Sequence, residues 1–216
     1  MVTKQHIDAV LGTLKRLVRQ WEEPIVGHYK ADSFTTLISC LLSLRTKDAT
    51  TRGAAQRLFR LARTPQQMSR LAPSSIERVI YPVGFYRTKA KTIRSVCETL
   101  LERYGGRVPD ELDALLTIKG VGRKTANLVI TLAFHKDGIC VDTHVHRISN
   151  RWGYVRTKTP EQTEMALRRI LPRRHWRAYN DLLVTFGQNL CHPTSPWCSR
   201  CPLMRVCAKV GVQHSR

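Results

Sequence analysis

Two side chains of this 216-residue chain are suited to covalent chemistry on an electrophilic carbon, Lys124 and Asp142. Lys124 follows the glycine-rich stretch KGVGR, where the cations Lys119 and Arg123 and the start of a helix disfavour the ammonium form. A lysine in such a place has a larger neutral, nucleophilic fraction than a free lysine. Asp142 lies eighteen residues later and precedes an apolar-periodic run, which predicts a helix N-cap that stays ionised. Taken alone, a lysine at a helix start is more often simply solvated.

The glycines before Lys124 predict a phosphate-binding loop. Gly120 and Gly122 flank Val121, and without Cβ atoms the backbone N–H groups of such a loop can approach a phosphate oxygen. The N-terminus of the following helix adds the positive end of its dipole. A loop of this kind holds a DNA backbone without reading its sequence. The alternative is a plain helical turn that needs glycine flexibility, and the basic composition favours phosphate binding.

Four of the seven cysteines form a dense group near the end of the sequence. So short a segment cannot bury much apolar surface, and a metal would supply the missing folding energy. Four thiolates suit tetrahedral zinc or a [4Fe–4S] cluster, and the spacing alone does not choose between them. The spacing C-x6-C-x2-C-x5-C runs through Cys191, Cys198, Cys201 and Cys207. The other three cysteines lie in apolar settings and are predicted as buried core residues: Cys40, Cys97 and Cys140.

The charge balance points to a polyanionic partner. Thirty-six Lys and Arg residues against sixteen Asp and Glu residues give a formal net charge of +20, and nucleic acid is the first partner to consider. Basic surfaces also serve membranes, but no segment is apolar and long enough for a signal peptide or a transmembrane helix. We therefore expect a cytoplasmic, nucleoid-associated protein with no membrane partner. In that reducing setting clustered cysteines more often hold a metal than form disulfides.

Helical periodicity dominates the chain and predicts an all-α protein of roughly ten short helices. No stretch has a convincing period of two. The first helix is expected from an apolar series at steps of three and four, with Thr3 as its cap: Ile7, Leu11, Leu14, Val18 and Trp21. Further N-caps are predicted at Asp32, at Thr64 before a proline, and at Thr159 before a proline. Gly105 and Gly106 predict a helix end.

The elements around Lys124 form a helix–hairpin–helix. One helix is expected to end with an apolar run at 112–118, residues 119–123 make the tight connection, and a second helix continues from there. The chain resembles the endonuclease III family of DNA glycosylases in three motifs that occur in this order: GVGRKTAN, VDTH and the cysteine spacing. The resemblance extends from about residue 32 to residue 207 and includes LLSLRTKD at 41–48 and VGFYRTKAK at 83–91.

This resemblance implies two helical domains with a DNA-binding cleft between them. Residues 26–136 would form a six-helix barrel domain containing the helix–hairpin–helix. Residues 1–25 together with 137–216 would form an iron–sulfur domain, whose C-terminal loop carries a [4Fe–4S] cluster on the four cysteines. The partner would be double-stranded DNA that contains damaged bases or abasic sites, and we expect a monomer.

The resemblance also assigns roles to single residues. Lys124 matches the nucleophilic lysine and Asp142 the catalytic aspartate. Arg45 stands where many members place a glutamine that fills the gap left by the extruded nucleotide, and Phe85 stands where an apolar residue wedges into the base stack. The hairpin residues would bind the DNA backbone: Lys119, Gly120, Val121, Gly122 and Arg123.

The function implied is excision of oxidised or damaged pyrimidines, followed by strand cleavage through a lysine Schiff base. The alternatives are a mismatch-specific thymine or adenine glycosylase of the same superfamily and a non-catalytic DNA-binding module. Mismatch glycosylases often lack a lysine at the position of Lys124 or carry an additional domain, so Lys124 and the short chain argue against that alternative. The pairing of Lys124 with Asp142 argues against the non-catalytic module. Lys119 replaces a frequent proline, Arg45 replaces glutamine, and the loop CHPTSPWC lacks cations that Arg200 and Arg205 could supply. The basic stretch 168–177 is either an extended DNA footprint or a solvated face.

Overall fold

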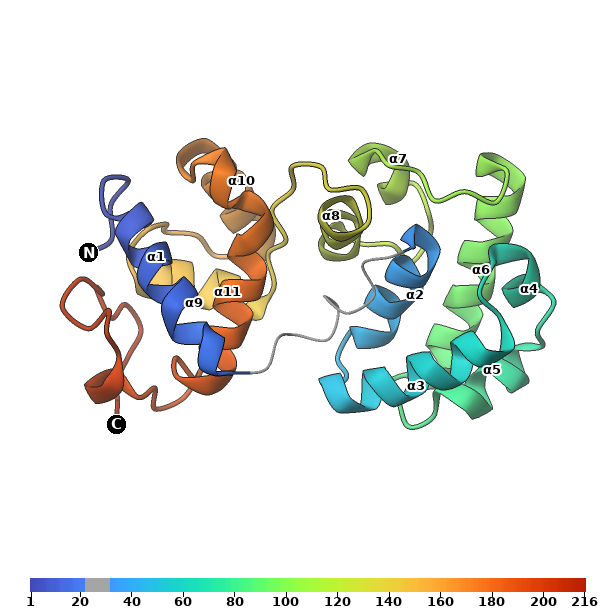
Figure 1. The fold of residues 1–216 in the computed structure, drawn as a ribbon, viewed down its shortest axis with the longest axis horizontal. Helices are drawn as coiled ribbons and strands as arrows, with labels where there is room; N and C mark the ends of the chain where they lie inside the picture. Colours follow the sequence, from blue (N-terminus) through green and yellow to red (C-terminus); the bar gives the residue numbers. More distant parts are fainter. Residues whose placement is uncertain (22–31) are drawn as a thin grey trace. The chain divides into compact units, whose positions relative to one another are not determined.

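The computed structural model describes residues 1–21 and 32–216, which form eleven α-helices and no β-strand. The predicted all-α class is therefore confirmed, and none of the described helices is both long and apolar enough to cross a lipid bilayer. The helices are α1 (Ile7–Leu17), α2 (Ser33–Ser43), α3 (Asp48–Leu61), α4 (Pro65–Ser69), α5 (Pro73–Ile80), α6 (Tyr86–Tyr104), α7 (Leu112–Leu116), α8 (Arg123–Leu132), α9 (Thr143–Arg151), α10 (Pro160–Ile170) and α11 (Trp176–Asn189) (Figure 1). Short 3₁₀ turns lie at η1 (Val18–Gln20), η3 (Arg173–His175) and η4 (Cys198–Arg200).

Side-chain caps set the starts of several helices. Asp32 accepts hydrogen bonds from the backbone N–H groups of Phe34 and Thr35 at 3.3 and 2.9 Å, which fixes the start of α2. Thr64 and Thr159 cap α4 and α10 in the same way, and in both helices a proline follows. These three predicted caps are confirmed.

The start of the first helix differs from the prediction. Thr3 does not cap α1, because its hydroxyl is hydrogen-bonded to the ring of His6 at 3.1 Å and the helix begins only at Ile7. A turn closed by the His6 N–H and the Thr3 carbonyl precedes the helix. The regular helix ends at Leu17, so the predicted run to Trp21 continues as a 3₁₀ turn instead.

The chain divides into two compact units, each described here by itself. The terminal unit comprises residues 1–24 and 137–216, and the central unit comprises residues 25–136. The predicted domain boundary between residues 25 and 26 lies outside the described residues. The six-helix barrel expected over 26–136 stays a prediction.

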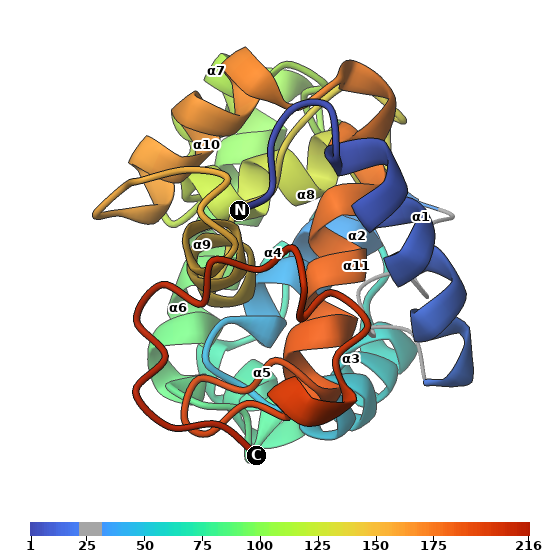
Figure 2. The same ribbon diagram turned by 90° about the vertical axis from the view of Figure 1, so that its left-hand side faces the viewer.

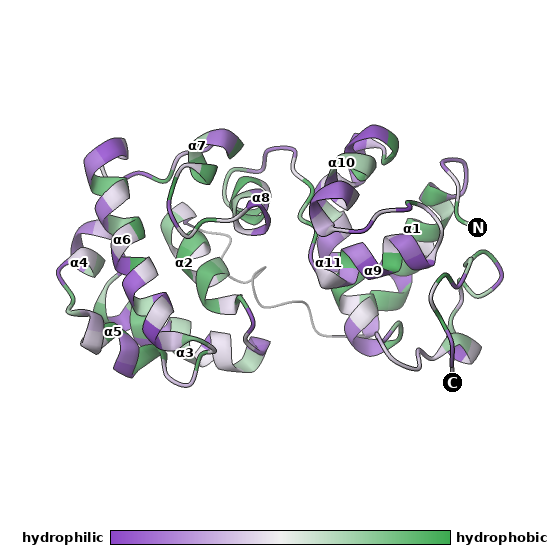
Figure 3. Ribbon diagram, turned by 180° about the vertical axis from the view of Figure 1, so that it is seen from behind, coloured by the Kyte–Doolittle hydropathy of each residue, from purple (hydrophilic) through white to green (hydrophobic). Residues whose placement is uncertain are grey.

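In the central unit, α2 and α8 form the apolar centre. Leu37, Ile38 and Leu42 of α2 are fully buried, and α8 is buried from Thr125 to Leu132. Helix α2 packs against α3, α6 and α8, which explains why it is buried from Phe34 to Leu42. Much of its ribbon is correspondingly coloured as hydrophobic in Figure 3.

The long helix α6 supports this centre. It packs against α2, α4 and α5 and ends at Tyr104, and its C-cap residue Gly105 has the left-handed φ of 60° that glycine adopts without strain. The Gly106 N–H then donates to the Leu100 carbonyl at 2.8 Å, so the predicted helix end is confirmed. Cys97 of α6 and Cys40 of α2 are buried as expected.

In the terminal unit, α11 packs against α9 and α1. Figures 1 and 2 both show α1 beside α11, although the two helices lie at opposite ends of the sequence. Residues of all three helices belong to one apolar core, which also contains Trp152, and the ring centroids of Trp152 and Phe186 are 6.3 Å apart. Cys140 is buried in this unit and its carbonyl accepts from Asn180 at 3.3 Å.

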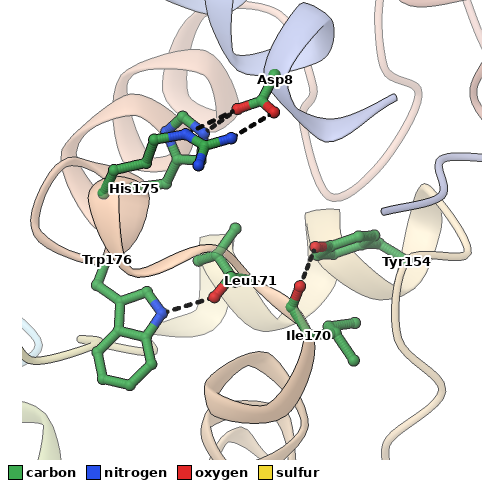
Figure 4. Close-up of polar contacts among 7 residues, drawn as sticks. Asp8, Tyr154, Ile170, Leu171, His175 and Trp176 are labelled. Carbon is green, nitrogen blue, oxygen red and sulfur yellow. Dashed lines mark hydrogen bonds and ion pairs between the residues drawn. The ribbon is translucent and has the colours of Figure 1, made fainter. Parts of the chain in front are cut away.

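A polar contact ties α1 to the turn between α10 and α11. Asp8 accepts from Arg174 Nη2 at 2.6 Å, and its other oxygen lies 2.5 Å from His175 Nε2 (Figure 4). The hydrogen bonds from Arg174 and His175 lower the pKa of Asp8 below its ordinary value of 3.8. Beside them, the Trp176 ring N–H donates to the Leu171 carbonyl at 2.8 Å. Part of the basic stretch 168–177 therefore serves contacts within the protein.

Candidate active site

The glycine-rich stretch forms a tight connection between α7 and α8. The Val121 N–H donates to the Ile118 carbonyl at 2.9 Å and closes the turn, and α8 begins at Arg123. Helices α7 and α8 contact each other. The described residues thus contain the predicted helix–hairpin–helix, and we call residues 117–122 the hairpin loop.

Glycine suits positions 120 and 122 of the hairpin loop for different physical reasons. Gly120 has a φ of 93°, and a Cβ atom there would collide with the side chain of Thr92 on α6. Gly122 has an extended backbone with φ −86° and ψ 171°, and a Cβ atom there would meet no heavy atom within 4 Å. The fold therefore requires glycine at position 120, whereas at position 122 the absence of a side chain only leaves open surface.

The side chains of the hairpin loop are not equally available to a ligand. Lys119 is exposed, and Arg123, the first residue of α8 after the loop, is half-buried. Val121 is only 5% exposed, so its side chain packs inside the protein. Any contact of Val121 with DNA would have to come from its backbone.

Lys124 is the second residue of α8 and is half-buried. Its helix packs on α2, where burial raises the pKa of the Cys40 thiol to about 12 and the charge of Lys124 opposes that rise. The ammonium thus lies within electrostatic reach of the apolar centre of the central unit.

Asp142 is the N-cap of α9, as predicted. Its Oδ1 accepts a hydrogen bond from the Val145 N–H at 2.9 Å, and the residue is half-buried. Capping fixes the orientation of the carboxylate. Lys124 belongs to the central unit and Asp142 to the terminal unit, so the structure places each within its own unit.

The histidines after Asp142 have local partners. His144 Nδ1 lies 3.1 Å from Arg147 Nη2, and His146 Nδ1 lies 2.7 Å from the hydroxyl of Thr163. These contacts lie within the terminal unit and give both rings a structural role there.

Arg45 and Phe85 come together in the central unit. Arg45 follows α2 and Phe85 precedes α6, and both have a left-handed backbone, with φ of 52° and 58°. The guanidinium carbon of Arg45 lies 5.6 Å from the centroid of the Phe85 ring, which is a cation–π distance. Phe85 is 63% exposed. An apolar ring and a cation are thus presented side by side at the surface.

Sequence reasoning missed one residue near this pair. Lys89 is only 8% exposed, and its Nζ donates to the carbonyls of Leu42 and Leu44 and to the hydroxyl of Thr46. The available signal was its spacing, because Lys89 lies four residues before the buried Ile93 on the apolar stripe of α6.

The four clustered cysteines line one cavity of the terminal unit. The cavity is also walled by Trp152, Phe186 and Trp197 and encloses about 360 Å³ of space, part of it open to solvent. Burial raises the pKa of the Cys201 thiol to about 11, and the charges of the other three cysteines add to the rise. The pKa of the Cys207 thiol is raised as well, first by burial and then by the charges of Cys191 and Cys198. A bound metal group would offset the repulsion among clustered thiolates, so this donor set fits one.

A buried arginine accompanies the cysteines. Arg151 of α9 is 5% exposed, and its Nη1 donates to Cys191 Sγ at 3.2 Å and to the His192 carbonyl at 2.8 Å. The loop after α11 is thereby tied to α9. In residues 1–21 and 32–216, no group of three or more His, Cys, Asp or Glu side chains is arranged around a point that could hold a single metal ion.

Comparisons with known proteins agree on one family. Residues 38–173 match the HhH-GPD superfamily base excision DNA repair proteins. The chain is 47% identical over 181 residues to Endonuclease III of Thermotoga maritima, which covers 84% of this chain and 85% of that protein. It also resembles the solved structure of a non-covalent endonuclease III–DNA complex, with a TM-score of 0.88, 34% identity and 97% coverage of each chain. A trapped endonuclease III–DNA covalent intermediate, an estranged-adenine complex, gives a TM-score of 0.86 with the same identity and coverage.

Proposed function

This chain belongs to the endonuclease III family, within the HhH-GPD superfamily of base excision DNA repair proteins, and from that premise we propose that Lys124 and Asp142 carry its chemistry. The protein is a base-excision DNA glycosylase, and AP lyase activity is typical of the family. Its substrates, in this proposal, are oxidised or otherwise damaged pyrimidines in double-stranded DNA. It acts as a monomer.

The observation that carries the proposal is the position of Lys124. The lysine begins a helix directly behind a glycine-rich hairpin loop whose Gly122 leaves open surface for a phosphate. A strand held there by its backbone is delivered next to an amine. Asp142 follows as a rigidly capped carboxylate.

The amine of Lys124 acts as the nucleophile in the first chemical step. The nucleotide is first turned out of the base stack. The Lys124 nitrogen then forms a bond to C1′ of the sugar while the bond from C1′ to the base breaks, and the base leaves with the electron pair and takes up a proton. Asp142 stabilises the positive charge that develops on the sugar and assists the proton transfers.

Strand cleavage follows from the same adduct. The sugar ring opens to a protonated imine between the Lys124 nitrogen and C1′. Loss of a proton from C2′ then expels the 3′ phosphate by breaking the C3′–O3′ bond. Only an amine can form this imine, so Lys124 determines the reaction class.

Borohydride trapping tests the role of Lys124. Reduction of the imine should link the wild-type protein covalently to a duplex with an abasic site. Lys124→Ala should lower the trapped fraction by at least about a hundredfold. Lys91→Ala removes an exposed lysine from α6 and should trap like wild type. Undiminished trapping by Lys124→Ala would refute the assignment.

We also propose that Cys191, Cys198, Cys201 and Cys207 hold a [4Fe–4S] cluster. The shared cavity and the electrostatic influence of the other cysteines on Cys201 support a metal group at this site, and the family supports an iron–sulfur cluster over zinc. When bound, the cluster would cross-link the loop and supply folding energy. The purified protein should be yellow-brown, with about four irons per chain. A colourless, zinc-loaded protein with full activity would contradict the proposal.

A further inference from the structure

Lys89 is a buried ammonium held entirely by neutral oxygens. Its Nζ lies 2.7 Å from the Leu42 carbonyl, 2.5 Å from the Leu44 carbonyl and 3.1 Å from the Thr46 hydroxyl. These acceptors can use all three N–H bonds of the ammonium. Burial lowers the pKa of Lys89 to about 8, which reflects how far this group is removed from water.

The acceptors of Lys89 belong to one end of α2 and the loop that follows. Leu42 lies in the last turn of α2 and Leu44 is its C-cap residue, so both carbonyls lie at the negative end of the helix. Arg45 comes next, with its left-handed φ of 52°. A non-glycine residue keeps such a backbone only where its surroundings over-determine it. Lys89 supplies such a constraint from α6.

Thr46 connects this loop to the one that carries Phe85. Its hydroxyl accepts from Lys89 and also from the backbone N–H of Gly84 at 3.1 Å. A Cβ atom at Gly84 would lie 2.6 Å from the Arg45 carbonyl oxygen, so the two backbones are in direct contact. Phe85 follows Gly84 with its own left-handed φ of 58°.

The arrangement has a buried part, which joins the two loops, and an exposed part, which carries the two side chains. Below the surface, Lys89, Thr46 and Gly84 fix the two loops to each other. At the surface, the Arg45 guanidinium and the exposed Phe85 ring lie at 5.6 Å. Side chains that enter a base stack lose less conformational entropy when their backbone is already fixed.

We propose that Lys89 is a positioning residue for nucleotide extrusion, which holds the Arg45 loop against the Phe85 loop so that both side chains enter the DNA as one wedge. This inference rests on the proposed glycosylase function. A purely structural role is the competing explanation. A buried ammonium is costly to desolvate, and an apolar side chain of similar volume often serves stability equally well. The charge is therefore better explained by the geometry that its three hydrogen bonds impose.

The test compares two substrates under single-turnover conditions with saturating enzyme. One duplex carries an oxidised pyrimidine paired with a normal base, and the other carries a ready-made abasic site, which is less costly to extrude because no base must be unstacked. The variants are Lys89→Met, Thr46→Val and the exposed control Lys91→Met. Active enzyme is counted by the fraction that borohydride traps on abasic DNA.

Lys89→Met should slow base release from the paired lesion roughly ten- to hundredfold, while cleavage at the abasic site changes less than about threefold. Thr46→Val should show the same split, and it decides the matter if Lys89→Met does not fold. Lys91→Met should match wild type on both substrates. Equal losses on both substrates, or no loss on either, would overturn the inference. Failure of the proposed function would differ, because wild type itself would then neither release the base nor be trapped.

A combined variant tests whether Lys89 acts through the wedge. In an Arg45→Ala, Phe85→Ala background, Lys89→Met should reduce base release by less than a further factor of about two. The full loss seen in the wild-type background would overturn the assignment. An increase in 2-aminopurine fluorescence beside the lesion should report extrusion in wild type and be diminished in Lys89→Met.

Discussion

The substitution Gly122→Ala should weaken DNA binding without harming the fold. At the N-cap of α8, the extended backbone of Gly122 is accessible to alanine, and a Cβ atom meets no heavy atom within 4 Å. Alanine at a compatible position stabilises by about 0.4–1 kcal/mol by restricting the unfolded chain. It is also a poorer N-cap than glycine by a similar amount. The two effects nearly cancel, so the free energy of unfolding should change by less than about 0.5 kcal/mol.

Gly120→Ala is the matched control, two residues away in the same loop. Its φ of 93° and the side chain of Thr92 leave no room for a Cβ atom. The left-handed backbone alone costs alanine about 1–2 kcal/mol, and the displacement of Thr92 adds to this. Gly120→Ala should therefore be less stable than wild type in urea unfolding, whereas Gly122→Ala should not.

DNA affinity should show the opposite preference. A methyl group at position 122 would hold a phosphate away from the backbone N–H groups of the hairpin loop. The loss of one hydrogen bond to a charged group is about 1.5–3 kcal/mol, or roughly ten- to 150-fold in the dissociation constant. Fluorescence anisotropy with a duplex carrying a non-cleavable abasic analogue, at several salt concentrations, measures the effect.

The salt dependence identifies the cause. Gly122→Ala removes no cation and should keep the wild-type slope of log affinity against log salt. Lys119→Ala should lower that slope by about one. If Gly122→Ala binds within twofold of wild type, the glycine does not serve phosphate approach and that part of the reasoning fails.

Three further outcomes are expected. Burial lowers the pKa of Lys89 from its ordinary 10.5 to about 8, so between these two pH values the unfolded chain binds more protons than the folded protein. The free energy of unfolding of wild type in urea should therefore rise with pH across that window relative to Lys89→Met. Parallel pH dependences of the two proteins would contradict this expectation. Cys207→Ser should lower the iron content and the unfolding temperature, with unchanged iron speaking against this ligand. Thr159→Ala removes the N-cap of α10 and should lower the free energy of unfolding by about 1 kcal/mol. An unchanged midpoint of urea unfolding would show that this cap does not stabilise the protein.

Local rules explain what the sequence predicted well. The helix starts at Asp32, Thr64 and Thr159 depend on one side chain and the next three backbone N–H groups, which a short window of sequence contains. The hairpin loop and the cap at Asp142 are equally local. Such features depend little on the rest of the fold.

Long-range contacts explain what was missed. The oxygens that accept hydrogen bonds from Lys89 belong to Leu42, Leu44 and Thr46, which precede it by 43 to 47 positions in the sequence. No pattern around Lys89 identifies them. The contact of Val121 with DNA stays a prediction, but the burial of its side chain could not be predicted because it depends on how the hairpin loop packs. The identity of the metal could not be predicted from the cysteine spacing for a chemical reason, because zinc and iron–sulfur clusters both take four thiolates.

The discontinuous terminal unit has a consequence for synthesis. The ribosome completes the central unit before α9 and α11 exist, yet α1 needs α11 to cover its apolar residues Ile7, Leu11 and Leu14. At ordinary elongation rates this helix waits on the order of ten to thirty seconds for its partner. The apolar face of α1 is therefore uncovered during most of translation. We expect chaperones that bind nascent chains to bind this segment.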